Sequence, residues 1–435
     1  MKPSSIPACM AFLVLAGLIT AGGAVGRAGD WPGWRGPTGS GTTAERNLPL
    51  KWDGKTGEGV LWKAPLKGTT GHSSPIVWGD RVFITTAVQL TRQQEEAKQI
   101  PDHHFACYQA ADGKLLWQTR VAHGPHQEGY NIYAVPTPAT DGKAVYAWFG
   151  SAVMAAVDLQ GKLLWRKERG GKYTLNPGIC SSAVLCGDTM IVLCDQGGGN
   201  GWLEAVDKKT GEVKWRQKRD KFIYNNTTPL VVRVNGKDQL IVAGGNYGPA
   251  WLEGLNPAGG ESIWRCSANA FGASPVFASG LVLSEAPKET MLAVAAGGEG
   301  DVTKTLVKWQ SAKIKSPYSS AVVCGNYVYR VHDQGIVRCW DFTTGKDLFT
   351  ERLENLSHLA SPIATADGRI YFVSTGKSYV LRAGPKLEVI GGGNLGGGGN
   401  GSSPAVSNGR IFVRDFDFLY CLGNTPPRPA SGQTR

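Results

Sequence analysis

The stretch Ala205-Val-Asp-Lys-Lys-Thr-Gly-Glu-Val-Lys-Trp215 decides the fold of this chain. Asp207 and the Thr210-Gly211 pair are typical of a tight hairpin, because the carboxylate caps turn amides and glycine accepts a positive φ. Trp215 then supplies a large apolar ring that packs an outer strand against its neighbour. Degenerate copies of the stretch lie at Cys107–Trp117, Ala156–Trp165, Gly254–Trp264 and Cys339–Phe349.

Each copy belongs to a longer repeat of four predicted strands. A unit starts with Ser, Thr or Pro and a short apolar strand, a Gly-Asp or Gly-Asn turn leads to the second strand, and the third strand precedes the aromatic anchor of the fourth. The fourth-strand anchors are Trp62, Trp117, Trp165, Trp215, Trp264, Trp309, Phe349 and about Val389. The first strands begin near Ser73, Thr137, Ser181, Thr227, Ser274, Ser319, Ser361 and Ser402.

The two series are out of phase, which predicts how the chain closes on itself. Trp62 precedes every first strand, whereas the first strand near Ser402 has no fourth strand after it. We therefore expect residues 60–66 to complete the final sheet. The span 60–423 gives about 45 residues to each of eight units, as in β-propeller blades of roughly 40–50 residues. The sequence predicts an all-β, eight-bladed propeller of four-stranded antiparallel blades, with the last blade closed by an N-terminal strand.

Composition supports this class and excludes others. The 435 residues include 59 Gly, 24 Pro and 14 Trp, and only 19% are charged. A coiled coil would be rich in Ala, Glu, Lys and Leu, and a disordered chain would hold fewer than 42% hydrophobic residues. Eight cysteines follow Cys9; several occupy repeat positions, where a small buried residue is the simplest account.

The two ends of the chain differ from the repeat. Lys2 and the apolar run from Ala8 to Ala21 predict a signal peptide over residues 1–28, too short to span a bilayer as a helix. Residues 29–59 form a Trp/Pro/Gly arm, which we expect to cover the propeller flank; the alternative is an arm that projects freely to dock a partner. Residues 424–435 are expected to form a disordered tail. The expected location is periplasmic or secreted, with no transmembrane helix.

The repeat resembles the pyrrolo-quinoline-quinone (PQQ) repeat superfamily, whose tryptophan-docking motif residues 205–215 match in full. Other similar stretches are Asp30–Pro37, Pro136–Gly142, Asp195–Gly197 and Ser402–Ala405. The superfamily includes quinoprotein alcohol dehydrogenases and the outer-membrane assembly lipoprotein BamB. The resemblance implies a propeller and leaves PQQ as a possible cofactor. The dehydrogenases carry an adjacent cysteine pair over PQQ, and BamB-like proteins carry a lipobox. This sequence has neither, so we expect no cofactor.

All seven histidines are predicted on one face of the propeller. The loops from strand two to strand three, and from strand four to the next strand one, share this face, here called the top. His103, His104, His123 and His126 lie in two long top loops around the first blade, and histidine is a common ligand of zinc, copper or nickel. The alternative is that these loop histidines only hydrogen-bond to backbone groups.

A second candidate site is the mouth of the central channel on the top face. Polar and aromatic residues precede or begin the first strands, and a ligand or peptide suits such a concave mouth. The residues are His72, Asn225, Asn226, Phe271, Tyr318, His358 and Asn400. The alternative is that they satisfy strand ends and trapped water.

The net charge of +11 does not by itself indicate nucleic-acid binding. The most basic stretch is Lys214, Arg216, Lys218, Arg219 and Lys221. It is better explained as a solvated edge strand, where lysine opposes edge-to-edge pairing. The leading hypothesis is a non-catalytic module that binds a protein or glycan through its top face. The alternatives are a PQQ- or metal-dependent oxidoreductase and a BamB-like outer-membrane assembly factor.

Overall fold

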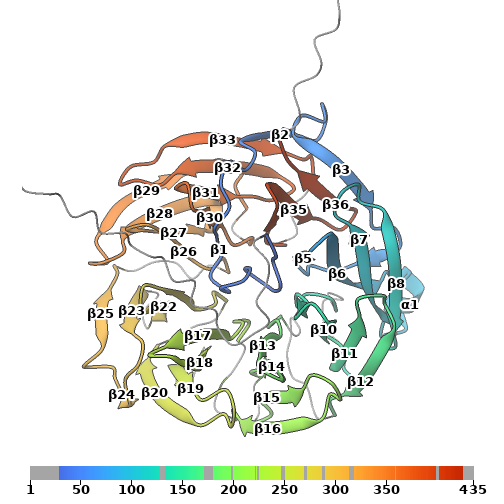
Figure 1. Ribbon diagram of the computed structural model, residues 1–435, viewed down its shortest axis with the longest axis horizontal. Coiled ribbons are helices and arrows are strands. Elements are labelled where there is room, and N and C mark those ends of the chain that lie inside the picture. Colours follow the sequence, from blue (N-terminus) through green and yellow to red (C-terminus); the bar gives the residue numbers. More distant parts are fainter. Residues whose placement is uncertain are drawn as a thin grey trace, which may run out of the picture.

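The computed structural model describes most of the chain and shows an all-β fold. The described residues are 29–127, 133–170, 180–196, 199–220, 222, 225–245, 250–268, 272–286, 290–312, 318–357, 359–397 and 401–424. Apart from strands they contain one short helix, α1 (Arg92–Glu96), and one 3-10 turn, η1 (Asp333–Gly335). In Figure 1 the sheets follow one another around a common centre in chain order, as in a β-propeller.

The described strands form eight sheets, numbered here as blades in the order of their first strands. Blade 1 holds β5 (Ile76–Trp78), β6 (Arg81–Val88), β7 (His103–Gln109) and β8 (Leu115–Val121), with β4 (Thr69–Thr70) added to β6. Blade 2 holds β9 (Ala139–Thr140), β10 (Ala144–Phe149), β11 (Val153–Asp158) and β12 (Leu163–Glu168). Blade 3 holds β13 (Val184–Cys186), β14 (Thr189–Cys194), β15 (Trp202–Asp207) and β16 (Val213–Lys218).

Blades 4 to 6 repeat this order of four antiparallel strands. Blade 4 holds β17 (Leu230–Val234), β18 (Lys237–Gly244), β19 (Trp251–Leu255) and β20 (Ser262–Ser267), with β24 (Gly300–Asp301) added. Blade 5 holds β21 (Val276–Ala278), β22 (Leu281–Ala286), β23 (Thr290–Ala295) and β25 (Val307–Gln310). Blade 6 holds β26 (Val322–Cys324), β27 (Tyr327–His332), β28 (Ile336–Asp341) and β29 (Asp347–Arg352).

The last two blades include strands from the N-terminal region. Blade 7 holds β30 (Ile363–Thr365), β31 (Arg369–Phe372), β32 (Lys377–Arg382) and β33 (Val389–Asn394), flanked by β1 (Thr42–Thr43) and β2 (Lys51–Asp53). Blade 8 holds β34 (Ala405–Ser407), β35 (Arg410–Arg414) and β36 (Phe418–Leu422), and β3 (Val60–Pro65) pairs antiparallel with β36.

A circuit of hydrogen bonds joins the starts of the first strands. Each backbone N–H donates to the side-chain hydroxyl at the same position of the next blade, over 2.8–3.0 Å. The residues, in order, are Ser74, Thr137, Ser182, Thr228, Ser274, Ser320, Ser361 and Ser403. The last bond runs from Ser403 N to Ser74 Oγ, so the circuit returns to its first residue. All eight residues are buried, so each hydroxyl satisfies an amide that would otherwise be unpaired.

Tryptophans fasten neighbouring blades at the outside of the sheets. The indole Nε1–H of Trp165, for example, donates to Lys208 O of the next blade over 2.8 Å, and the ring lies against Gly211. Gly211 has a φ of +72°, so this position requires glycine both for the turn and for the indole. Trp62, Trp117, Trp215 and Trp309 make the equivalent bond. The predicted docking role of the aromatic anchors is therefore confirmed at these positions.

Blade 7 differs from the expected pattern. The structure aligns Gly391, not Val389, with the anchors of the other blades, because Gly391 pairs with Val380 as Trp165 pairs with Ala156. The arm compensates: β2 pairs in parallel with Gly392–Asn394, and the buried Trp52 lies against Gly393. A Cβ at Gly393 would collide with Trp52. Close approach of the arm backbone therefore explains Gly391 and Gly393, where a Cβ would meet Leu50 O and Trp52 O.

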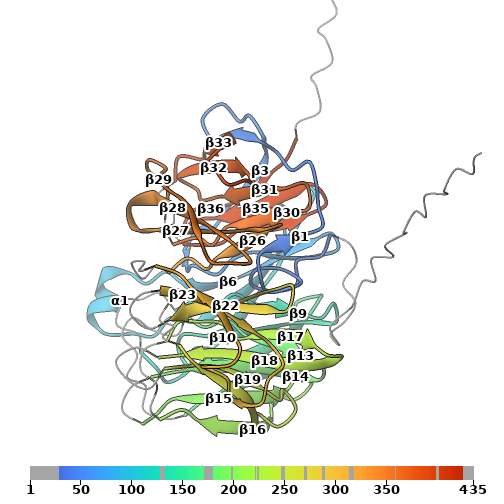
Figure 2. The ribbon, with the colours of Figure 1, turned by 90° about the vertical axis from the view of Figure 1, so that its left-hand side faces the viewer.

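The first part of the arm crosses the bottom of the propeller, the end that carries the strand one–strand two hairpins. Trp31 bridges Val77 of blade 1, Pro32 O accepts from Thr140 N of blade 2, and Ser40 Oγ accepts from Phe277 N of blade 5. Figure 1 shows this segment inside the ring, and Figure 2 shows β1 and α1 toward opposite ends. The expectation that the arm covers the flank is wrong for residues 30–43, because their backbone groups pair with hairpin ends; only β2 lies on the flank.

Replacing Ser274 tests the circuit. We expect Ser274→Ala to lower the free energy of unfolding by roughly 1–3 kcal/mol, because the buried amide of Thr228 loses its acceptor. Ser274→Thr should restore most of the loss, since Thr137 and Thr228 occupy the same position. Urea unfolding followed by tryptophan fluorescence measures both. Equal stability of wild type and Ser274→Ala would contradict the proposed contribution.

Candidate functional site

The histidines of the first two top loops are arranged around Ser151. The ring of His103, on β7, is fully buried, stacks on Phe149 and places Nε2 2.5 Å from Ser151 Oγ. The same hydroxyl accepts from Gly124 N, while His126 N donates to Ser151 O. Burial lowers the pKa of His103 to about 3, so its imidazole is neutral at physiological pH. This arrangement fixes the loop that follows β8 onto blade 2.

The four histidines do not form a metal centre in the described part of the chain. No group of three or more His, Cys, Asp or Glu side chains there could hold an ion. His103 and His104 are consecutive in β7 and so point to opposite faces of the sheet. His123 is exposed, with Nδ1 2.9 Å from Gly124 O, and its amide donates to Asp102. The alternative interpretation, hydrogen bonding to backbone groups, accounts for His123. His103 and His104 lie in β7 rather than in a loop, and the buried His103 bonds to the Ser151 hydroxyl.

Four of the seven predicted mouth residues lie in the described part of the chain. His72 is half-buried, with its ring edge-on to Phe416 at 4.8 Å, and Tyr318 is 47% exposed. Asn226 is half-buried. The amide of the buried Asn225 donates to Asp195 and Ala243 and accepts from Thr227 N, so it holds the start of blade 4 in place. Phe271, His358 and Asn400 lie outside the described residues.

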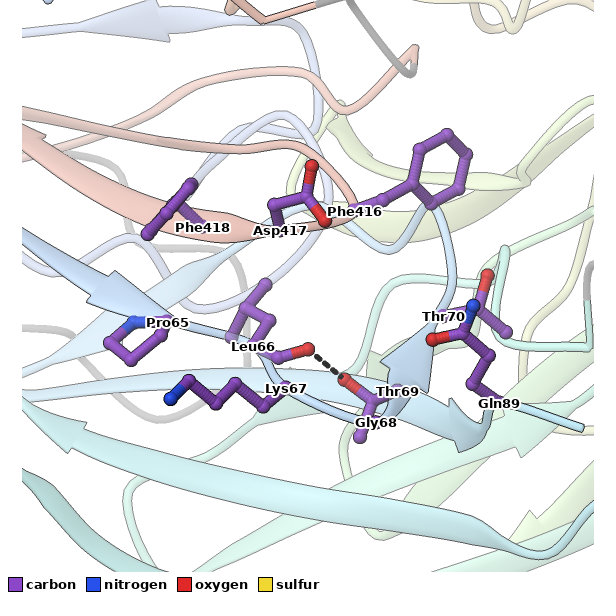
Figure 3. Close-up of a pocket in the computed structure, with 10 residues that line it drawn as sticks. All are labelled: Pro65, Leu66, Lys67, Gly68, Thr69, Thr70, Gln89, Phe416, Asp417 and Phe418. Carbon is purple, nitrogen blue, oxygen red and sulfur yellow. Dashed lines mark hydrogen bonds between the residues drawn. The ribbon is translucent and has the colours of Figure 1, made fainter.

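A pocket of about 330 Å³ adjoins this mouth between blades 8 and 1. It is lined by Pro65, Leu66, Lys67, Gly68, Thr69, Thr70, Gln89, Phe416, Asp417 and Phe418. Figure 3 shows Lys67 and Pro65 near one end, Phe416 and Gln89 near the other, and the bond from Thr69 Oγ1 to Leu66 O between them. Phe416 is 42% exposed. The pocket thus combines an exposed aromatic ring with one cation, one acid and several neutral polar groups.

Sequence reasoning missed these pocket residues. They come from the end of β3 and the connection that follows it, from Gln89 directly after β6, and from the β35–β36 loop with the start of β36. The Asp415-Phe-Asp-Phe418 segment carries a signal, because an exposed Phe between two acids is unusual in a tight turn. The pairing of β4 with β6, which forms one wall, has no repeat counterpart and so left no pattern to find.

Buried charges at the top ends of blades 3 and 4 are paired with one another. Arg219 donates from Nε and Nη2 to the two oxygens of Asp195 over 2.5 and 3.0 Å, and its guanidinium lies 3.9 Å from the Phe222 ring centroid. Both charged residues are almost fully buried. Such a pair orients neighbouring loops, and removing one partner would leave a buried unpaired charge. These groups are therefore structural in their present arrangement.

The described residues do not fit the PQQ site that the resemblance implies. The buried cation, acid and amide at the top ends of blades 3 and 4, Arg219, Asp195 and Asn225, are bonded to each other rather than directed at a ligand. None of the eight cysteines beyond Cys9 forms a disulfide, and burial raises the pKa of Cys107 to about 12. No reaction step is therefore assigned to PQQ.

Arg35 is a charged group of the arm that sequence reasoning did not single out. Its Nη2 donates to Ser40 O and Ala321 O over 2.8 and 2.6 Å, which ties the arm to blade 6. Nε and Nη1 have no acceptor among the described residues, and burial lowers the pKa to about 9. Gly41 must be glycine here, because a Cβ would collide with the guanidinium. The bottom end is thus held by a buried, unpaired cation.

Comparison with known proteins identifies the family. The family model described as "Outer membrane protein assembly factor BamB" matches residues 40–176 and 199–323, more than half of the chain. The chain belongs to this PQQ-repeat family. Membership confirms the resemblance drawn from residues 205–215. A search of curated proteins found no match to the sequence. Among the described residues, no helix has the length and apolarity needed to cross a bilayer.

Several solved structures share the fold at low sequence identity. BamB from Moraxella catarrhalis is 14% identical, with a TM-score of 0.60 over 85% of this chain and 99% of that one. Quinohemoprotein alcohol dehydrogenase from Comamonas testosteroni is 13% identical, with a TM-score of 0.64 over 94% and 82%. The computationally designed Ika8 protein is 12% identical, with a TM-score of 0.55 over 84% and 99%. These likenesses confirm an all-β propeller.

The buried His103 predicts a specific acid sensitivity. Below its ordinary pKa of 6.5 the unfolded chain binds a proton at His103 that the folded chain excludes down to about pH 3. As the pH is lowered below 6.5, the free energy of unfolding should therefore decrease by about 1.4 kcal/mol per pH unit because of this residue. His103→Phe, which keeps the stack on Phe149, should remove that slope between pH 6.5 and 4.5 in urea titrations. His123→Phe is the matched control on an exposed ring; identical slopes in all three proteins would refute the assignment.

Proposed function

We propose that this chain is an exported, non-catalytic propeller that binds a partner protein through its top face. The observation that carries the proposal is the difference between the two ends of the ring. At the bottom, residues 30–43 pair with the hairpins of several blades. At the top, Tyr318, Leu359 and Phe416 expose 39–47% of their surface around the mouth, beside His72. Exposed aromatic and apolar groups around a concave site are typical of binding surfaces.

The proposal includes the finer architecture. We infer a closed eight-bladed ring over residues 60–423, in which β3 completes the last blade; the return of the hydroxyl circuit from Ser403 to Ser74 supports it. Residues 1–28 are proposed as a cleaved signal peptide and residues 424–435 as a disordered tail, which places the mature protein in the periplasm or outside the cell.

Family membership favours one role for such a module. The matching family is named for assembly of outer-membrane proteins, a process in which the factor meets other polypeptides. We therefore propose a protein, rather than a glycan, as the partner. An oxidoreductase is the rival class, supported only by the fold shared with a quinohemoprotein dehydrogenase.

Site-specific photo-crosslinking in the source cells tests the proposed face. A benzoylphenylalanine at position 416 or 318 replaces an aromatic residue, and one at position 237 reports on the bottom hairpin of blade 4. We expect one protein adduct, identified by mass spectrometry, from positions 416 and 318 and none from 237. Adducts from position 237 alone, or no protein adduct from either top position, would refute top-face binding. Dye reduction by purified protein that depends on added PQQ or metal would favour the oxidoreductase.

A further inference from the structure

The outer edges of the blades share one irregular position that is exposed on some blades and covered on others. In each blade the fourth strand has an extra residue just before the anchor, where the register with the third strand shifts. The extra residues, from blade 1 to blade 8, are Leu116, Leu164, Lys214, Ile263, Lys308, Leu348, Ile390 and Leu61. The same site on one scaffold therefore carries either an apolar residue or lysine.

Two blades cover this site with a strand from the chain itself. On blade 4, β24 pairs in parallel with Trp264 and Arg265, and Val302 and Leu306 pack in the apolar cluster that includes Ile263. On blade 7, β2 pairs in parallel with β33, and Leu50 packs in the cluster that includes Ile390. In both cases a short extended segment binds the edge and partly covers the apolar residue.

Blades 1 and 2 present the same features without a cover from the described chain. Both contain the pentapeptide Gly-Lys-Leu-Leu-Trp, at 113–117 and 161–165. Leu116 is 40% and Leu164 47% exposed, and Leu115 and Leu163 beside them are exposed as well. Figure 1 shows β8 and β12 as neighbours on the outer rim. On blades 3 and 5, lysine takes the place of the leucine, as expected for edges that must stay unpaired.

The covering segment of blade 4 indicates the chemistry of a matching ligand. It brings an acid, Asp301, to within 3.8 Å of Arg265, next to the apolar Val302. Arg166 of β12 directly follows the anchor Trp165, as Arg265 follows Trp264. Arg166 already donates to Ala122 O, His123 O and Glu168, and the equivalent residue of β8 is Gln118. The extra residue before the anchor does not prevent strand pairing, since β20 and β33 both contain it and still pair with a parallel strand.

The geometry points to the outer edges of β8 and β12 as a docking site for an extended segment of a partner protein, which adds as a parallel strand and places apolar and acidic side chains over Leu116, Leu164 and the adjacent basic groups. Main-chain bonds to the edge supply affinity and the side chains supply selectivity. Because the two sites lie on adjacent blades, one partner with two such segments would gain from multivalency. This site is separate from the top face.

A peptide copied from the chain provides the probe. Residues 298–306, Gly-Glu-Gly-Asp-Val-Thr-Lys-Thr-Leu, are the segment that covers β20. At millimolar concentration it should slow amide hydrogen exchange in residues 115–121 and 163–168 of the full chain, with a saturable dependence on concentration. A scrambled peptide should have no effect. Self-association of the chain through these edges, or no protection by the peptide, would overturn the proposal, because the peptide reproduces contacts that the chain itself makes.

Substitutions separate the edge from the rest of the surface. Leu116→Lys with Leu164→Lys should abolish the protection and leave the fold intact, because lysine occurs naturally at the equivalent positions 214 and 308. The matched control is Val389→Lys, which changes an equally exposed apolar residue (48%) on an edge already covered by β2. It should leave the protection unchanged. Equal protection in the double variant and the wild type would also overturn the proposal.

Discussion

The hydroxyl circuit around the inner strands is the constraint on which the rest of the structure depends. A buried amide at the start of each first strand needs an acceptor, and only the next blade can supply it. Each blade therefore has to sit at one height and one angle relative to its neighbour. Serine and threonine serve equally because the bond needs only a hydroxyl at the β-carbon. Six of these residues precede proline, which has no backbone N–H and therefore needs no further hydrogen-bond acceptor near the crowded axis.

At the outside of the ring, the tryptophan anchors also join each blade to the next, through buried apolar area as well as a hydrogen bond. An indole N–H reaches a carbonyl of the next blade, and the ring needs a glycine beneath it. Where the repeat loses its aromatic residue, at Gly391, the N-terminal arm brings Trp52 and a parallel strand. The arm thus supplies the missing aromatic contact of blade 7 at the rim and also covers the axis at the bottom. A segment outside the repeat therefore packs at both the outer rim and the bottom of the propeller.

Most groups with reactive chemistry are used inside the protein. His103 binds Ser151, Asp195 binds Arg219, and six of the eight described thiols are buried. The exposed groups are of another kind: aromatic and apolar residues around the top mouth and leucines on the rim of blades 1 and 2. This distribution supports the proposed binding role, because recognition uses accessible apolar surface.

The sequence by itself determined the propeller class, the repeat and its phase, because hairpin turns and anchors are local signals with a fixed spacing. It also predicts His72 and Tyr318 near the mouth, since strand starts meet at the axis. Tertiary structure alone decided three things: the bonding of Asn225 to Asp195, the pocket beside Phe416, and the path of the arm through Arg35 and Trp52. Each of these joins residues from different blades or from outside the repeat. No local pattern encodes such contacts, because they depend on which surfaces remain uncovered once the ring has formed.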